Sequence, residues 1–97
     1  MSEPDRLVTR VQTGVRLEAG ILNVLKALAA LKGMTLGDLI EGIVLHAFEG
    51  QCAFSEATRA QIRDLKKVYG LKLKASDSHL LAEAAPRRAV KRAKAKR

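Results

Sequence analysis

The chain has 97 residues, 47% of them hydrophobic, and a formal net charge of +8, which is enough for one small domain with appendages. Its single cysteine, Cys52, excludes a disulfide framework, and no apolar run reaches the roughly 18 residues that span a membrane. Residues 1–5 are acidic and lack a signal-peptide pattern. We therefore expect a cytoplasmic protein that has no membrane partner.

The positive charge is concentrated at the C-terminal end. Residues 1–50 hold five basic and six acidic side chains, whereas residues 51–97 hold thirteen basic and four acidic ones. Residues 86–97 contain no acidic side chain, and like charge at this density predicts a disordered, polyanion-binding tail. The basic residues of this tail are Arg87, Arg88, Lys91, Arg92, Lys94, Lys96 and Arg97.

The first patterned segment, residues 10–17, follows a flexible arm expected over residues 1–9. Its side chains alternate between apolar and polar, which is typical of a β-strand with one buried face. One face carries Val11, Thr13, Val15 and Leu17, and the other carries Arg10, Gln12, Gly14 and Arg16.

Two helices are expected next. Residues 21–32 have apolar side chains at helical spacing, and Gly33 can end that helix in the left-handed conformation. Thr35 can begin a second helix, because its hydroxyl can accept the backbone N–H of Asp38. The apolar spacing of this second helix continues to Gly50.

The C-terminal half predicts a third helix and a short fourth one. Ser55 is placed to cap a helix that runs to Tyr69 and ends at Gly70. Residues 76–78 could cap a short helix over residues 80–83. Whether the third helix packs on the core or waits for a partner stays open at this point.

A lone strand and two helices make a very small folded unit. Ordering these residues costs about 1.5 kcal/mol each, and the unpaired backbone of one strand adds to the cost. A symmetric dimer resolves both problems, because two copies of residues 10–17 can pair antiparallel and the helices can share one core. The expected dimer core is Val11, Thr13, Val15, Leu17, Leu25, Leu28, Leu39, Ile40, Ile43 and Val44.

The outward face of such a two-stranded ribbon has the chemistry to read DNA. A ribbon fits the major groove, where arginine can donate two hydrogen bonds to guanine and glutamine can pair with adenine. Arg16 and Gln12 provide those groups, and Gly14 would let the backbone come close to the duplex.

Residues of about 10–50 resemble the ribbon-helix-helix superfamily of prokaryotic DNA-binding proteins, the Arc/MetJ/CopG type. The resemblance lies in the stretches "RVQTGVRL", "ILNVLKALAALK", "GMT" and "LGDLIEGIVLHAFEG". It implies a homodimer that inserts its ribbon in the major groove of double-stranded DNA. The implied base-reading residues are Gln12, Gly14 and Arg16, and the implied phosphate contacts are Arg10, Thr35, Leu36 and Gly37.

The expected fold class is therefore mainly α: a ribbon-helix-helix domain over residues 10–50, a helical extension over 51–85 and a basic disordered tail over 86–97. The expected function is sequence-specific DNA binding in transcriptional regulation, most simply repression, in the cytoplasm at the nucleoid. No catalytic arrangement is evident, so we expect no enzyme and no cofactor. His46 and His79 stand alone, so no metal site is expected either.

Other functions stay open on the sequence. The first is an antitoxin whose residues 51–85 bind a toxin through the stripe of Ile62, Leu65, Val68 and Tyr69. The second is an assembly scaffold, which the net charge of −1 over residues 1–50 would suit. A third is a nucleoid-associated protein that binds DNA broadly through its tail.

Overall fold

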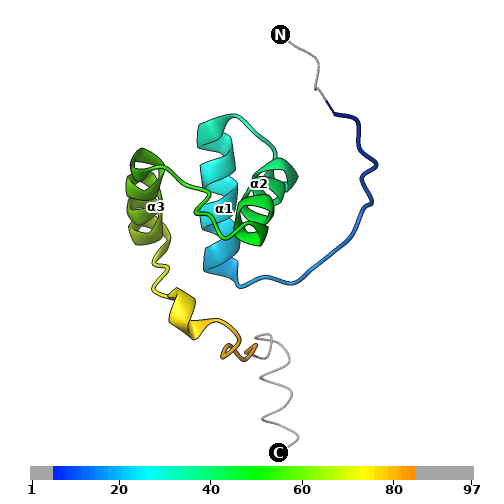
Figure 1. Cartoon of the computed structure of the whole chain (residues 1–97). Helices are drawn as coiled ribbons and strands as arrows, with labels where there is room; N and C mark the ends of the chain where they lie inside the picture. The colour runs from blue at the N-terminus through cyan, green and yellow to red at the C-terminus, as the bar shows by residue number, and fades with distance from the viewer. Residues whose placement is uncertain (1–5, 85–97) are drawn as a thin grey trace, which may run out of the picture.

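A computed structural model describes residues 6–84, and these residues form three α-helices joined by loops (Figure 1). Helix α1 spans Ala19–Lys32, α2 spans Leu36–Phe48 and α3 spans Glu56–Tyr69. A single 3-10 turn, η1, follows at Ala75–Asp77. The expectation of a mainly α protein is confirmed.

The first helix begins earlier than its apolar spacing indicated. The Glu18 side chain accepts the backbone N–H of Ile21 at 2.8 Å, so α1 starts at Ala19 and not at Ile21. This cap satisfies one of the free N–H groups that every helix start leaves open. Gly33 ends α1 with a φ of 68°, in the left-handed conformation that was expected of it.

The caps of the other two helices are confirmed as the sequence predicted them. The Thr35 hydroxyl accepts the Asp38 N–H at 3.0 Å, and the Ser55 hydroxyl accepts the Thr58 N–H at 3.2 Å. Gly70 ends α3 with a φ of 67°. These short-range signals therefore set the limits of both helices.

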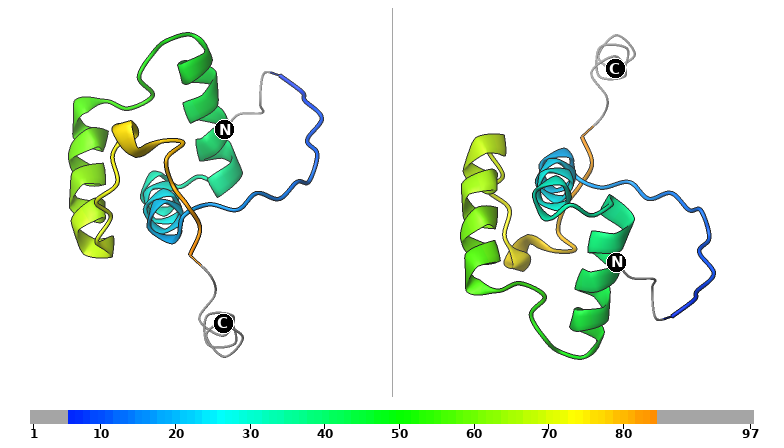
Figure 2. Two further views of the ribbon diagram at one scale, coloured as in Figure 1. Left: turned by 90° about the horizontal axis from the view of Figure 1, so that it is seen from below. Right: turned by 90° about the horizontal axis from the view of Figure 1, so that it is seen from above.

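Helix α1 lies in the middle of the molecule, and α2 and α3 each pack against it and not against one another (Figure 2). The core is small: Leu28, Ala29 and Leu39 are buried in one cluster. Partly buried apolar side chains from all three helices and the loop before α3 surround it, namely Leu25, Ile43, Phe54, Ile62 and Leu65. The third helix therefore belongs to this core.

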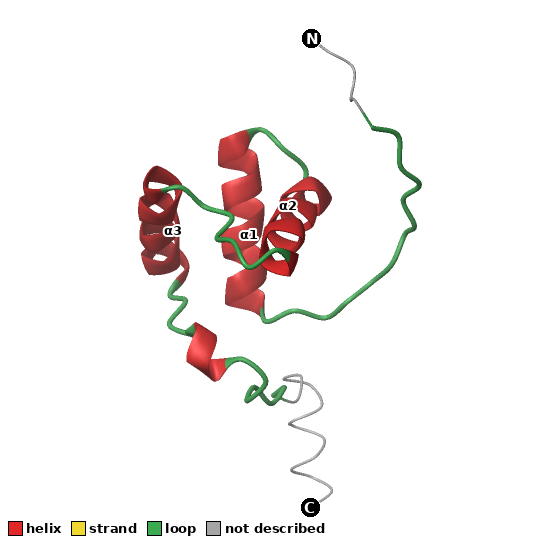
Figure 3. Cartoon of the chain, viewed as in Figure 1, coloured by secondary structure: helices red, strands yellow, loops and turns green. Residues whose placement is uncertain are grey.

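The expected β-strand is wrong. Residues 10–17 run as an extended segment with no strand, and the part of the chain that the structure describes contains no strand elsewhere (Figure 3). A strand exists only where its backbone N–H and C=O groups bond to a neighbouring strand, and residues 6–84 offer none. The fold shown is thus a three-helix body with an extended segment, and a ribbon-helix-helix fold is not shown.

The expected short helix over residues 80–83 is also wrong. Asp77 accepts the Lys74 N–H through its side chain at 2.8 Å, and the Leu80 N–H then bonds the Asp77 carbonyl at 3.0 Å. His79 takes a φ of 68° in this turn, so the chain reverses where a helix was expected and continues without regular structure to residue 84.

The tail over residues 86–97 lies outside the described residues, and so do its basic side chains, Arg87, Arg88, Lys91, Arg92, Lys94, Lys96 and Arg97. Among residues 6–84, no helix has the length and apolar character to cross a membrane.

Candidate nucleic-acid interface

Residues 6–18, here called the arm, stand away from the helices on the α2 side of the molecule (Figures 1 and 2). Within the described chain, no backbone hydrogen bond involves residues 6–17. The expected base-reading residues Gln12, Gly14 and Arg16 are all exposed on this arm. The side chains of the arm and the unpaired backbone of residues 6–17 are therefore open to solvent.

The apolar side chains of the arm are as open as the polar ones. Leu7 is 94% exposed, Val11 81% and Val15 74%. The end of α2 also has an apolar side chain in solvent, since Phe48 is 79% exposed. Isolated exposed apolar residues are common on protein surfaces, whereas large contiguous apolar patches are found at interaction sites.

A groove of about 1220 Å³ separates the arm from α1 and the start of α2. Its lining brings together residues that the sequence assigned to DNA, because Arg10 and Gly14 of the arm face the same space as the first turn of α2. That turn contributes Thr35, Leu36 and Gly37. Gln12 and Arg16 lie outside the lining.

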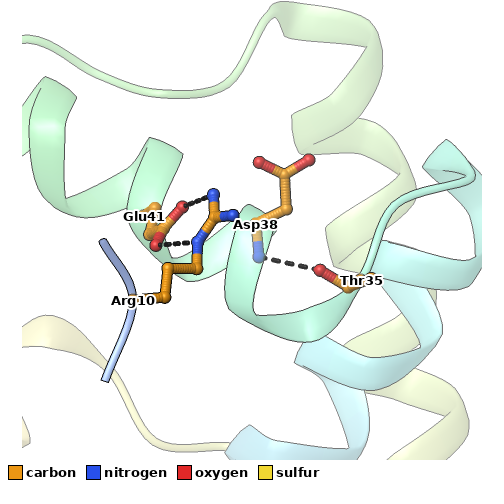
Figure 4. Close-up of polar contacts among 4 residues, drawn as sticks. All are labelled: Arg10, Thr35, Asp38 and Glu41. Atoms are coloured by element: carbon orange, nitrogen blue, oxygen red, sulfur yellow. Dashed lines mark hydrogen bonds and ion pairs between the residues drawn. The ribbon is translucent and has the colours of Figure 1, made fainter. Parts of the chain in front are cut away.

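One ion pair joins the arm to α2 across this groove (Figure 4). Arg10 donates from Nε to Glu41 Oε2 at 2.9 Å and from Nη2 to Glu41 Oε1 at 2.7 Å. This two-point geometry is the strong form of an arginine–carboxylate contact. The Glu41 hydrogen bond raises the pKa of Arg10, and the Arg10 hydrogen bond holds the pKa of Glu41 below its ordinary value of 4.5.

The start of α2 is less suited to a phosphate than the sequence suggested. Its free N–H groups and helix dipole favour an anion, and Gly37 leaves space, since a Cβ there would meet nothing within 4 Å. However, the Thr35 hydroxyl already takes the Asp38 N–H, and the carboxylates of Asp38 and Glu41 stand beside the same turn (Figure 4). Their charge would oppose a phosphate unless Arg10 offsets it.

A second ion pair ties the other end of the arm to the C-terminal segment. Arg16 donates from Nε to Glu83 Oε1 at 3.2 Å and from Nη2 to Glu83 Oε2. Both side chains line another groove, of about 1160 Å³, at the start of α1. The same groove is lined by Tyr69 and Leu71 from the end of α3 and the residues after it.

The residues expected in a dimer core are divided by the structure into three groups. Leu28 and Leu39 are buried within the single chain, and Leu25, Ile40 and Ile43 are partly buried. The remainder are exposed, namely Val11, Thr13, Val15, Leu17 and Val44. The exposed group lies on the arm and on the neighbouring side of α2.

Sequence reasoning missed Glu41 and Glu83 as partners of the arm. Glu41 looks like an ordinary solvated helix residue, and Glu83 lies 67 residues from Arg16, so no local pattern links either pair. His46 stays alone and contacts the Gly42 carbonyl through Nδ1 at 2.7 Å. No group of three metal-ligating side chains occurs in the described part of the chain.

Comparison of the chain with protein-family models, curated proteins and solved structures found no match. The resemblance to ribbon-helix-helix proteins therefore remains an expectation from the sequence.

Proposed function

We propose that this chain forms a homodimer that binds double-stranded DNA through its arm and acts as a transcriptional repressor. The observation that carries the proposal is the arm itself, an extended and exposed segment with a free backbone and with Arg10, Gln12 and Arg16 along it. The proposal includes no two-stranded ribbon, because residues 10–17 form no strand in the structure.

The second copy is supported by what the single chain leaves uncovered. Among residues 6–84, the buried apolar side chains are Val24, Leu28, Ala29 and Leu39, which is a small core for a segment of this length. Val11 and Val15 on the arm, and Val44 and Phe48 on α2, remain in solvent. Association with a second copy would remove these side chains from water.

The contact with DNA follows from the chemistry of the arm. Arginine side chains of DNA-binding proteins contact phosphates and the base edges that the grooves of the duplex expose. Arg16 and Gln12 have the donors and acceptors that pair with guanine and adenine. Arg10 would contact a phosphate after leaving Glu41, and Gly14 would let the backbone come close, since nothing lies within 4 Å of a Cβ built there.

The basic tail would supply affinity that does not depend on sequence. Seven basic side chains between residues 86 and 97 can each displace counterions condensed on the duplex. The described helices and arm contribute little net charge, so most of the salt dependence of binding should come from this tail.

The deciding experiment is a selection of bound fragments from genomic DNA at two salt concentrations, followed by mobility-shift titration of the selected sequence. Arg16→Ala should weaken binding to that sequence by about 1–3 kcal/mol for each arm and leave the dimer intact, because each arm loses one base contact. Arg63→Ala, which removes an exposed arginine on α3, is the matched control. Unchanged discrimination in Arg16→Ala would count against base reading by the arm.

Deletion of residues 86–97 tests the tail separately. The deletion should flatten the dependence of log affinity on log salt by up to about six for each chain, or about twelve for a dimer, as expected for seven lost phosphate contacts per tail at roughly 0.9 each. An unaltered slope would remove the tail from the mechanism while leaving the arm in place.

The packing of α3 bears on the rival antitoxin function, and the DNA-binding experiments separate the other two. Ile62 and Leu65, offered to a toxin on the sequence, pack against the core of this chain, so only Val68 and Tyr69 of that stripe remain exposed. An assembly scaffold would be favoured if the protein bound no DNA even at low salt, and a nucleoid-associated protein if it bound all sequences alike.

A further inference from the structure

The two arginines of the arm that were expected to contact DNA, Arg10 and Arg16, already bind carboxylates of the same chain. Arg10 binds Glu41 on α2, and Arg16 binds Glu83 in the C-terminal segment. Each pair engages Nε and Nη2 of the guanidinium with the two carboxylate oxygens. A carboxylate held in this geometry occupies the same donors that a phosphate or a guanine edge would use.

Glu83 reaches Arg16 because α3 carries the chain back to the start of α1. Gly70 reverses the chain after α3, and Leu71 then lies over Gly20, where a Cβ would stand 3.2 Å from Leu71 Cδ1. The groove at the start of α1 is lined by residues on both sides of η1, namely Lys72 before it and Leu81 and Glu83 after it. The arm leaves the body at this point, so Arg16 and Glu83 meet there.

We propose that the C-terminal segment, residues 80–84, is an autoinhibitory strap on the arm, in which Glu83 holds Arg16 and must be displaced before DNA binds. This inference rests on the proposed DNA binding and adds its regulation. It gives α3 a role in DNA binding, since α3 packs on the core and delivers Glu83 to the arm.

The strap is weak enough to be displaced. Arg16 and Glu83 have side-chain exposures of 80% and 61%, so water and salt screen their attraction. Release of such a pair should tighten DNA binding about two- to fivefold for each arm, and about four- to twenty-five-fold for a dimer with two arms. A duplex carrying many phosphates competes against one carboxylate, so DNA would prevail at moderate salt.

The test is the full-length Glu83→Gln variant, titrated with the selected DNA beside the wild type. Glutamine keeps the size of the side chain and removes the charge, so binding should tighten by the stated factor. Glu56→Gln is the matched control, because it changes the net charge equally but lies at the start of α3, about 20 Å along the helix from Tyr69. The control should change the dissociation constant less than twofold.

Two further measurements separate the strap from a general effect of charge. In an Arg16→Ala background, Glu83→Gln should no longer tighten binding, because the contact it releases is already gone. In DNA-free protein, the Nε–Hε resonance of Arg16 should shift on Glu83→Gln and stay in place on Glu56→Gln. Equal tightening in both backgrounds, or an unmoved resonance, would overturn the strap.

The outcomes also distinguish failure of the strap from failure of the proposed DNA binding. DNA binding by the wild type with no change in Glu83→Gln would overturn the strap and leave the proposed function standing. Absence of DNA binding in the wild type and in every variant would overturn both.

Discussion

The helical body, residues 19–70, and the arm, residues 6–18, differ in where their backbone hydrogen bonds and apolar contacts are made. In the body, every helix has a side-chain cap at its start, α1 and α3 end at left-handed glycines, and the apolar stripes meet in one core. In the arm, the backbone of residues 6–17 has no hydrogen-bond partner within the described chain, and Val11 and Val15 are exposed. The helices of the body therefore make their backbone hydrogen bonds within one copy of the chain, whereas residues 6–17 of the arm make none within the described chain.

The difference shows what each kind of pattern needs. A helix makes its hydrogen bonds within its own segment, so caps and 3.6-residue spacing are enough to define it. An alternating segment makes its hydrogen bonds with another segment. Alternation therefore predicts an extended conformation but does not identify the segment that pairs with it. The second copy that we propose would supply such a partner for the arm, and the following variants test that proposal.

The largest effect is expected from the double variant Val11→Ser with Val15→Ser. If a second copy covers these side chains, four valines per dimer return to water at about 1.5 kcal/mol each, which totals about 6 kcal/mol and weakens the dimer about ten-thousandfold. Sedimentation should show a monomer, and circular dichroism should show unchanged helix content. Leu45→Ser, on α2 outside the groove lining, is the control and should leave the dimer intact. A dimer that survives the double variant would show that the arm is not its interface.

The next largest effect is expected in the body. Leu28 is 1% exposed in the core, so Leu28→Ala should lower the free energy of unfolding by about 2–5 kcal/mol, measured by urea denaturation. Leu31→Ala is the matched control, since this leucine lies one turn later in α1 and is 59% exposed, and its loss should cost about 0.5 kcal/mol or less. Equal losses in both variants would mean that the helices pack differently from the arrangement described.

The sequence predicted the parts of this structure that depend on neighbours in the chain. Thr35, Ser55, Gly33 and Gly70 mark helix limits through bonds that span three to five residues, and the structure bears them out. The strand over residues 10–17 was wrong because its existence depends on atoms outside the segment.

The candidate site divides in the same way. The alternating pattern placed Arg10, Gln12, Gly14 and Arg16 on an outward face, and they are exposed, but the residues it placed on a buried face are exposed in the described chain as well. The contacts with Glu41 and Glu83 depend on how α2 and the C-terminal segment return to the arm, and such separations of 31 and 67 residues leave no local signal. Charge alone could not select these two acids from the other acidic side chains.

A smaller effect is expected at Gly42, inside α2. A Cβ there meets nothing within 4 Å in one copy of the chain, so Gly42→Ala should stabilise the protein by about 1 kcal/mol through helix propensity. Gly20→Ala is the contrast, because its Cβ would lie 3.2 Å from Leu71 Cδ1 and 3.1 Å from Glu18 Oε1, and the gain should be smaller or reversed. Denaturation as a function of protein concentration would check both. A loss in Gly42→Ala that grows with concentration would mean that the second copy packs on this side of α2 and not only on the arm.

The smallest effect is expected from pH, at the contact that joins the arm to the body. Arg10 holds the pKa of Glu41 below 4.5, so the contact is fully present above that value and is lost as the pH falls through the lowered pKa, when Glu41 becomes protonated. The arm should then leave α2 while the helices stay formed, because the contact is exposed and contributes little to folding. Carboxyl chemical shifts measured by NMR should give a Glu41 midpoint below 4.5 in the wild type, rising toward 4.5 in Arg10→Ala. The same midpoint in both proteins would mean that the arm is not held to α2 in solution, and that the arm is separate from the body even before a partner binds.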